Sequence, residues 1–223
     1  MVARSLVTPG VAYVAPMAAF LLLLTAGPYL GLGVYEYPLR VAILSAVLWG
    51  CSRQVIDLRA PSWPGSAVLG AAVFVIWVGP DWLWPAWRSH WVFQNSITGV
   101  VKTSLPPGYE SSSLVLVCRA LRAVVLVPII EELFWRGWLM RWLIDSDVEK
   151  VPLGAYARAS FWITAALFAG EHGAFWEVGL AAGILYNWWM LHTRSLGDCI
   201  VAHAVTNGLL SAYVVLAGKW EYW

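Results

Sequence analysis

Charged residues are scarce in this chain of 223 residues, because Asp, Glu, Lys and Arg together make up 12% of it. Soluble globular proteins carry about 25% charged residues. With 60% apolar residues and a mean hydropathy of +0.68, a water-soluble fold could not cover itself with so few charges, so we expect a lipid bilayer to surround the chain. The net charge of +1 gives no excess of basic residues, which argues against a nucleic-acid partner.

Cysteines are also few, and Cys51, Cys118 and Cys199 show no Cys-x-x-Cys spacing. Each lies in or beside an apolar run, so we expect buried thiols and no disulfide or metal framework. Internal repeats, low-complexity tracts and a soluble domain are all lacking. A signal peptide is not indicated either, because Arg4 is a weak basic start and no small-residue cleavage site follows.

Long apolar runs are what the sequence has instead. A membrane-spanning helix needs about 20 mainly apolar residues, and candidate runs lie near 11–30, 39–56, 66–87, 112–143, 157–172, 174–192 and 197–217. We expect part of the run 112–143 to project or bend, because it is too long for one crossing. The segment Arg88–Ser111 is the longest polar stretch and reads as a loop or a surface helix. The fold class is therefore an all-α, polytopic transmembrane bundle of about seven to eight helices.

Basic residues predict the orientation of the bundle, because they favour the cytoplasmic side. An N-terminus in the cytoplasm puts more of them inside than outside, which favours that orientation. We expect a multi-pass protein of a bacterial or archaeal cell membrane. The residues assigned to the inner side are Arg4, Arg53, Arg59, Arg136, Arg141, Lys150, Arg158 and Arg194. Those assigned to the outer side are Arg40, Arg88, Lys102 and Lys219.

Two adjacent carboxylates, Glu131 and Glu132, interrupt the long apolar run. Ionisable groups inside membrane spans are costly, so each is a candidate functional group. On a helix, Glu132 and Arg136 are four residues apart and share a face, where they can pair. Glu131 points about 100° away, and a carboxylate in such a low-dielectric site is a competent general base towards water. A purely structural Glu–Arg pair at a helix end would give the same pattern.

Two further motifs place polar side chains in later apolar runs. Phe168 and His172 are four residues apart, and a core or interfacial histidine is the alternative there. His203 and Asn207 emerge from one helix face, where an imidazole and an amide can both donate to one developing oxyanion. Hydrogen bonds that join helices would explain this pair equally well. The remaining titratable groups fall at the ends of runs, where we expect interfacial or capping roles: Glu36, Asp81, Glu177, His192 and Asp198.

Taken in order, the three motifs resemble those of the CAAX proteases and bacteriocin-processing enzymes, a family that includes the Ras-converting enzyme. The motifs are Glu-Glu-x-x-x-Arg (131–136), Phe-x-x-x-His (168–172) and His-x-x-x-Asn (203–207), and all match residue for residue. The resemblance divides the chain into N-terminal transmembrane helices and a loop (1–111), a catalytic membrane core (112–217) and a short tail (218–223). The length and the many tryptophans are similar to the exosortase-associated branch of the family.

The resemblance implies an intramembrane endopeptidase with a polar cavity between its C-terminal helices. In such a protein Glu131 would activate water, His172 would position that water, and His203 and Asn207 would form the oxyanion hole. The supporting residues would be Glu132, Arg136 and Phe168. The partners implied are the lipid bilayer and a membrane-anchored or lipidated peptide or protein substrate, of which prenylated C-terminal tails are the best known in the family.

Other interpretations stay open from the sequence. Glu131, His172 and His203 could together form a two-His, one-carboxylate zinc site. We favour catalysis without a metal or other cofactor, because Asn207 is a poor zinc ligand but a good oxyanion donor. A non-catalytic immunity or scaffold protein is one alternative, in which the motifs only join helices. A proton-coupled transporter is another, although such proteins usually show internal repeat symmetry.

Overall fold

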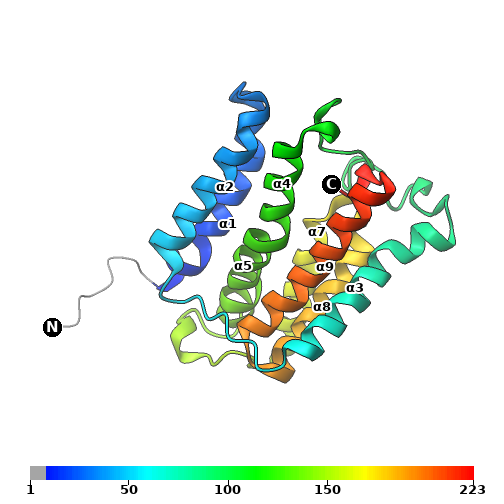
Figure 1. Cartoon of the computed structure of the whole chain (residues 1–223). Helices are drawn as coiled ribbons and strands as arrows, with labels where there is room; N and C mark the ends of the chain where they lie inside the picture. The colour runs from blue at the N-terminus through cyan, green and yellow to red at the C-terminus, as the bar shows by residue number, and fades with distance from the viewer. Residues whose placement is uncertain (1–8) are drawn as a thin grey trace.

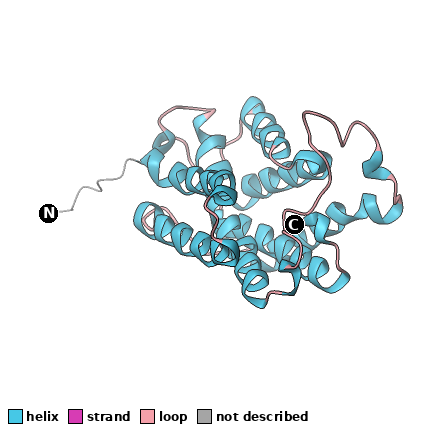
Figure 2. Cartoon of the chain, turned by 90° about the horizontal axis from the view of Figure 1, so that it is seen from above, coloured by secondary structure: helices cyan, strands magenta, loops and turns pink. Residues whose placement is uncertain are grey.

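The computed structural model describes residues 9–223, which fold into a bundle of α-helices without a β-strand (Figure 1 and Figure 2). Helices α4, α5 and α6 continue one another from Ser113 to Trp142, so this part of the chain forms seven rods where the sequence predicts seven apolar runs. The predicted all-α class is confirmed. The helices are α1 (Pro9–Ala26), α2 (Glu36–Val47), α3 (Trp63–Leu83), α4 (Ser113–Leu121), α5 (Val127–Glu132), α6 (Met140–Trp142), α7 (Arg158–Gly170), α8 (Trp176–Thr193) and α9 (Leu196–Ala217).

The rod Ser113–Trp142 carries the first motif. The Ser112 side chain caps its start by accepting a hydrogen bond from the Val115 backbone N–H at 3.4 Å, which satisfies one free donor of the first turn. At about 1.5 Å per residue the rod is roughly 45 Å long, comparable to a bilayer with its headgroups. It stays helical throughout, but Arg122–Leu126 and Leu133–Leu139 are π-helical. Such turns are common at bends and functional sites.

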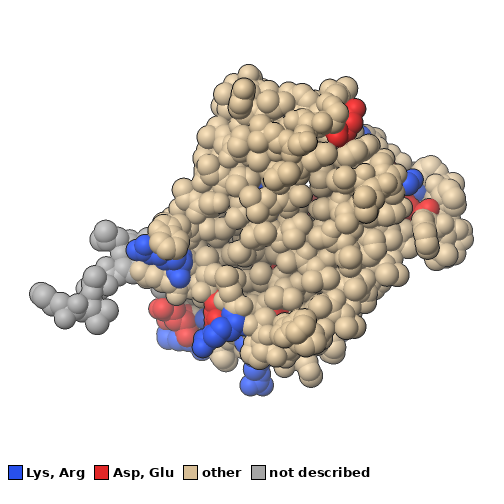
Figure 3. Space-filling model, viewed as in Figure 1, with Lys and Arg blue, Asp and Glu red and all other residues tan. Residues whose placement is uncertain are grey.

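Three helices are long and apolar enough to cross a membrane, namely Trp63–Leu83, Ser113–Trp142 and Leu196–Ala217. Large apolar side chains such as Val68 and Val117 are exposed on the outside of the bundle. On the face shown in Figure 3, charged atoms gather at the lower end and the upper right, and uncharged surface separates them. The chain is therefore an integral membrane protein.

The helices pack around the middle of the long rod. Helix α3 lies along α9, and α7 lies along α8, while α1 and α2 pack against the rod from the other side (Figure 1). Gly70 allows α3 to approach α9 closely, because a Cβ atom there would lie 2.3 Å from the Ala202 carbonyl oxygen. Small residues often permit such contacts between membrane helices. Ile130, Leu133 and Met190 are fully buried in the core between the elements.

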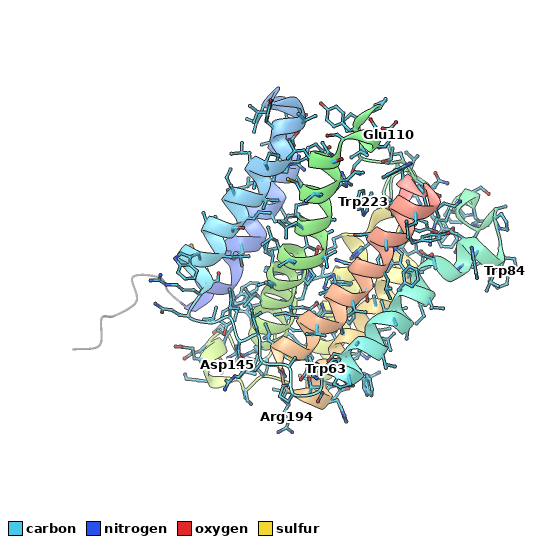
Figure 4. All side chains as sticks on the ribbon, viewed as in Figure 1. Trp63, Trp84, Glu110, Asp145, Arg194 and Trp223 are labelled. Carbon is cyan, nitrogen blue, oxygen red and sulfur yellow. The ribbon has the colours of Figure 1, made fainter. Side chains whose placement is uncertain are left out.

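The segment 84–112 is a loop, which decides between the two predicted alternatives. Its only helical parts are the short 3₁₀ turns Trp87–Ser89 and Tyr109–Ser111. The indole of Trp176 donates to the Val92 carbonyl at 3.2 Å, so the loop is fixed over the start of α8. Figure 4 labels Trp84 and Glu110 near its two ends, Glu110 at the top of the molecule and Trp84 at its right-hand side. Further 3₁₀ turns are Gly27–Tyr29, Gly33–Tyr35, Val148–Lys150, Gly173–Phe175 and Trp220–Tyr222.

Several of the acidic side chains that we expected at the ends of spans form ion pairs or hydrogen bonds with other elements. Asp81 and Glu177 both pair with Arg88, each at 2.8 Å, and join α3 and α8 through the loop. Asp198 is fully buried and so is not interfacial, but it does hold a helix end, because its Oδ1 atom accepts from the backbone N–H of Ser62, just before α3, at 3.0 Å and from the Ser66 hydroxyl at 2.9 Å. It therefore ties the start of α9 to the start of α3.

Two details of the sequence predictions need correction. Arg136 and Arg141, counted with the inner loops, are buried within the rod and so do not mark a loop. Arg4 lies outside the described residues. The three cysteines are free, but only Cys199 is fully buried, while the other two are half-buried.

Candidate active site

A cavity of about 190 Å³ lies between α3, the long rod, α7, α8 and α9. Glu131, His172, His203 and Asn207 lie on its wall, although they come from three separate segments of the chain. The other lining residues are mainly aromatic or apolar: Trp77, Ala123, Val127, Phe168, Ala182, Tyr186, Thr206, Leu210, Ser211, Tyr222 and Trp223. The bundle therefore gathers the polar side chains of all three motifs around one small, mostly apolar space.

The two neighbouring carboxylates face different surroundings. Glu131 faces the cavity, and its Oε2 atom lies 3.9 Å from Nε2 of His203. Glu132 is fully buried behind the cavity wall, and its Oε1 atom lies 2.9 Å from Nδ1 of His203 and 3.1 Å from Nη1 of Arg136. The helix geometry predicts this pairing of Glu132 with Arg136. The imidazole of His203 thus has one carboxylate near each of its nitrogens.

Arg136 is buried and supported on every side. Its Nε donates to Oδ1 of Asn187 at 3.0 Å, and its Nη2 donates to the Gly183 carbonyl at 3.3 Å. The guanidinium also lies over the Phe168 ring, 4.7 Å from the ring centre, which adds a cation–π contact. A buried charge is costly unless it is paired and hydrogen-bonded. These contacts, with Glu132, meet that requirement.

His172 is held at the end of α7 by its own turn. Its Nδ1 atom lies 2.7 Å from the Phe168 carbonyl oxygen. Because a carbonyl only accepts hydrogen bonds, Nδ1 carries the hydrogen, and Nε2 is left as an acceptor in the neutral ring. The edge of Trp77 packs on the ring at 5.0 Å. Gly179 makes room for it, because a Cβ atom there would lie 3.2 Å from the imidazole.

His203 and Asn207 face the cavity from α9. Tyr186 stacks on the His203 ring with centres 5.2 Å apart, and its hydroxyl is hydrogen-bonded to the Thr206 hydroxyl at 2.7 Å. The Asn207 amide donates one hydrogen bond to the Ala123 carbonyl at 2.9 Å. Since an amide nitrogen carries two hydrogens, the second stays available to another acceptor.

The sequence interpretation missed Glu171, which lies next to the first motif in space. The indole of Trp135 donates to Oε1 of Glu171 at 3.1 Å. Trp135 follows Glu131 by four residues and so shares its helix face. The only sequence signal was the position of Glu171 directly before His172.

Tyr222 and Trp223, which follow α9, also line the cavity (Figure 4 labels Trp223). The Tyr222 hydroxyl donates to Asp81 at 2.7 Å. Burial, together with this hydrogen bond, raises the pKa of the Tyr222 phenol, so it remains protonated and keeps donating. The Trp223 carbonyl accepts from the Ser104 backbone N–H at 2.8 Å. The segment after α9 is thus fastened to α3 and to the loop.

One comparison with known proteins finds a match. Residues 113–209 match the family model described as Type II CAAX prenyl endopeptidase Rce1-like. The matched residues extend from the start of α4 into α9 and include all three motifs. No curated protein and no solved structure matches the chain. Membership of the exosortase-associated branch stays a prediction. The match supports a CAAX-type intramembrane endopeptidase in general, and residues 113–209 are similar to the Rce1-like family of type II CAAX prenyl endopeptidases.

Proposed function

We propose that the protein is a glutamate-type intramembrane endopeptidase that cleaves membrane-anchored peptides or C-terminal tails. The observation that supports this most directly is the cavity, whose wall carries Glu131, His172, His203 and Asn207. Hydrolysis of a peptide bond inside a bilayer needs a place for water. Polar groups on facing helices provide one, because they can replace the hydrogen bonds of bulk water.

In the proposed reaction Glu131 is the general base. Its Oε2 atom accepts no hydrogen bond from the described residues, so it is free to take a proton from water. Nε2 of His172 accepts the other hydrogen of the same water and fixes its direction. The water oxygen attacks the carbonyl carbon of the substrate. The proton held by Glu131 then passes to the leaving amine as the C–N bond breaks.

His203 and Asn207 stabilise the oxyanion in this proposal. Because Nδ1 of His203 donates to Glu132, the ring offers a second N–H to the cavity only as an imidazolium. The Glu132 carboxylate orients the imidazole through this contact, and Arg136 holds the carboxylate in place. Asn207 adds its free amide hydrogen. Donors fixed in place before the reaction stabilise the developing charge without having to reorganise.

We propose catalysis without a metal ion. The alternative set of zinc ligands was Glu131, His172 and His203. Within residues 9–223 no three His, Cys, Asp or Glu side chains are arranged to hold a metal ion, which supports the metal-free proposal. Elemental analysis tests this, because stoichiometric zinc in purified, active protein would overturn the metal-free mechanism.

We also propose that the N-terminus faces the cytoplasm. The support is the number of basic residues at the end of the bundle where α8 meets α9, among them Arg53, Arg59 and Arg194. Basic residues in short loops favour the cytoplasmic side. A reporter fused after residue 223 tests this, because seven crossings would put it on the opposite side from the N-terminus.

The central experiment compares membrane proteomes of cells that contain the wild type, Glu131→Gln or Glu149→Gln. Glu149 is an exposed residue of the loop after α6 and serves as the control. We expect uncleaved, membrane-anchored precursors to accumulate with Glu131→Gln only. If no precursor accumulates although the variant is present at wild-type amounts, the protease proposal fails and a non-catalytic role is favoured.

A further inference from the structure

A second cavity, of about 370 Å³, lies at the upper end of the bundle between the α1–α2 hairpin and α4. Three arginines line it, Arg40 from α2 and Arg119 and Arg122 from the long rod. It shares no lining residue with the active-site cavity. Neither the motifs nor the proposed hydrolysis uses these arginines.

The charges in this second cavity are not balanced. Its one lining carboxylate, Glu36, already pairs with Arg40. Arg119 and Arg122 are 7% and 9% exposed, and neither has an acidic partner among residues 9–223. The eight residues before that range contain no Asp or Glu that could supply one. The cavity therefore contains more buried positive charge than the described part of the chain neutralises.

The guanidinium groups also keep unused hydrogen-bond donors. The Nε atoms of Arg40, Arg119 and Arg122 donate to no acceptor in the described structure. Arg119 uses Nη2 for the Ser104 hydroxyl at 2.6 Å, whereas no hydrogen bond of the Arg122 guanidinium is found within that part of the chain. A buried guanidinium without a partner is costly. An anion bound in the cavity would relieve this cost and use these donors.

The position and the chemistry together indicate the kind of anion. Arg119 and Arg122 lie within the first three turns of the rod, near the depth where a bilayer has its phosphates. The planar fork of an arginine matches the oxygens of a phosphate group in pairs. The cavity is also large enough for a phosphate with part of a headgroup. A carboxylate would fill less of it and engage fewer donors.

We propose that this cavity binds a phosphate group through Arg40, Arg119 and Arg122. The phosphate is carried by a lipid headgroup or is free inorganic phosphate, and the experiment distinguishes these sources. The site also touches the catalytic region. The guanidinium of Arg119 lies 5.2 Å from the ring of Trp223, which lines the active-site cavity. Bound phosphate would therefore fix a residue that lines the active site.

The test uses the full chain purified in detergent and stripped of lipid. Binding is followed by native mass spectrometry and by thermal unfolding. The probes are phosphatidylglycerol, diacylglycerol with the same acyl chains, and inorganic phosphate. Chloride at equal ionic strength is the control for inorganic phosphate. We expect phosphatidylglycerol to be retained and to raise the unfolding temperature, and diacylglycerol to do neither. A response to inorganic phosphate as well supports a site for the phosphate group itself. A response to inorganic phosphate alone assigns the site to a soluble phosphate.

Two variants link the response to the cavity. Arg122→Gln should weaken binding about tenfold, the effect of losing one charge-assisted contact. It removes a group without a partner, so its folding is not expected to suffer. The control is Arg158→Gln, an exposed arginine at the start of α7, which should bind as the wild type does. Equal retention of phosphatidylglycerol and diacylglycerol, wild-type binding by Arg122→Gln, or no response to any probe would overturn the proposal.

Discussion

Glu131→Gln and Glu132→Gln exchange the same atoms at neighbouring positions, yet we expect them to affect folding differently. Glu131 faces the cavity, and its Oε2 atom accepts no hydrogen bond from the described residues. An amide there removes the proton acceptor and breaks no hydrogen bond made by Oε2 within the described residues, so the free energy of unfolding should change little. Loss of a general base should slow hydrolysis by about 10²–10⁴-fold.

Glu132→Gln changes a different kind of contact. Oε1 of the fully buried Glu132 lies within hydrogen-bond distance of both Arg136 and His203. The amide leaves the Arg136 guanidinium without a counter-charge. Removing one partner of a buried ion pair costs about 3–5 kcal/mol. The remaining bonds from Arg136 to Asn187 and Gly183 compensate only in part, because both acceptors are neutral.

Thermal unfolding in detergent and precursor accumulation in membranes measure the two effects separately. Glu131→Gln should unfold at the same temperature as the wild type and the control Glu149→Gln. It should nevertheless leave precursors unprocessed. Glu132→Gln should unfold at a clearly lower temperature than the control. The reasoning is refuted if Glu131→Gln processes precursors at the wild-type rate, or if Glu132→Gln is as stable as Glu149→Gln.

Three further predictions test the packing and the oxyanion donors. Gly70→Ala should lower the free energy of unfolding by about 1–3 kcal/mol because it overpacks α3 against α9, and Gly50→Ala, with open space around it, should not. Tyr186→Phe should lower the free energy of unfolding by about 1 kcal/mol, because the hydrogen bond to Thr206 is lost, but precursor processing should continue. Loss of processing would show that the hydroxyl acts in the reaction. Asn207→Ala should slow processing by about 10²–10³-fold and cost about 1 kcal/mol of stability through the lost hydrogen bond to the Ala123 carbonyl. A wild-type rate of processing would remove Asn207 from the oxyanion hole.

The rods were predictable because each depends on one local property. A run of about 20 apolar residues is long enough for a span, so the run 112–143 predicts the rod Ser113–Trp142 almost to the residue. The π-helical turns inside that rod were not predictable, because their residues differ little from those of an ordinary apolar helix. The loop could not be told from a surface helix either. What fixes it is Arg88, whose partners Asp81 and Glu177 lie on two different helices.

In the candidate site too, contacts within one helix were predictable and contacts between helices were not. Helix periodicity could separate Glu131 from Glu132 and pair the latter with Arg136, because all three lie on one helix. It could not find Asn187, which holds Arg136 from 51 residues further along the chain, nor the contact between Glu132 and His203. This contact explains why the second carboxylate of the motif matters although it lies behind the cavity wall. Glu132 neutralises Arg136 and also contacts Nδ1 of His203, so one buried carboxylate connects the stability of the bundle to the proposed oxyanion hole.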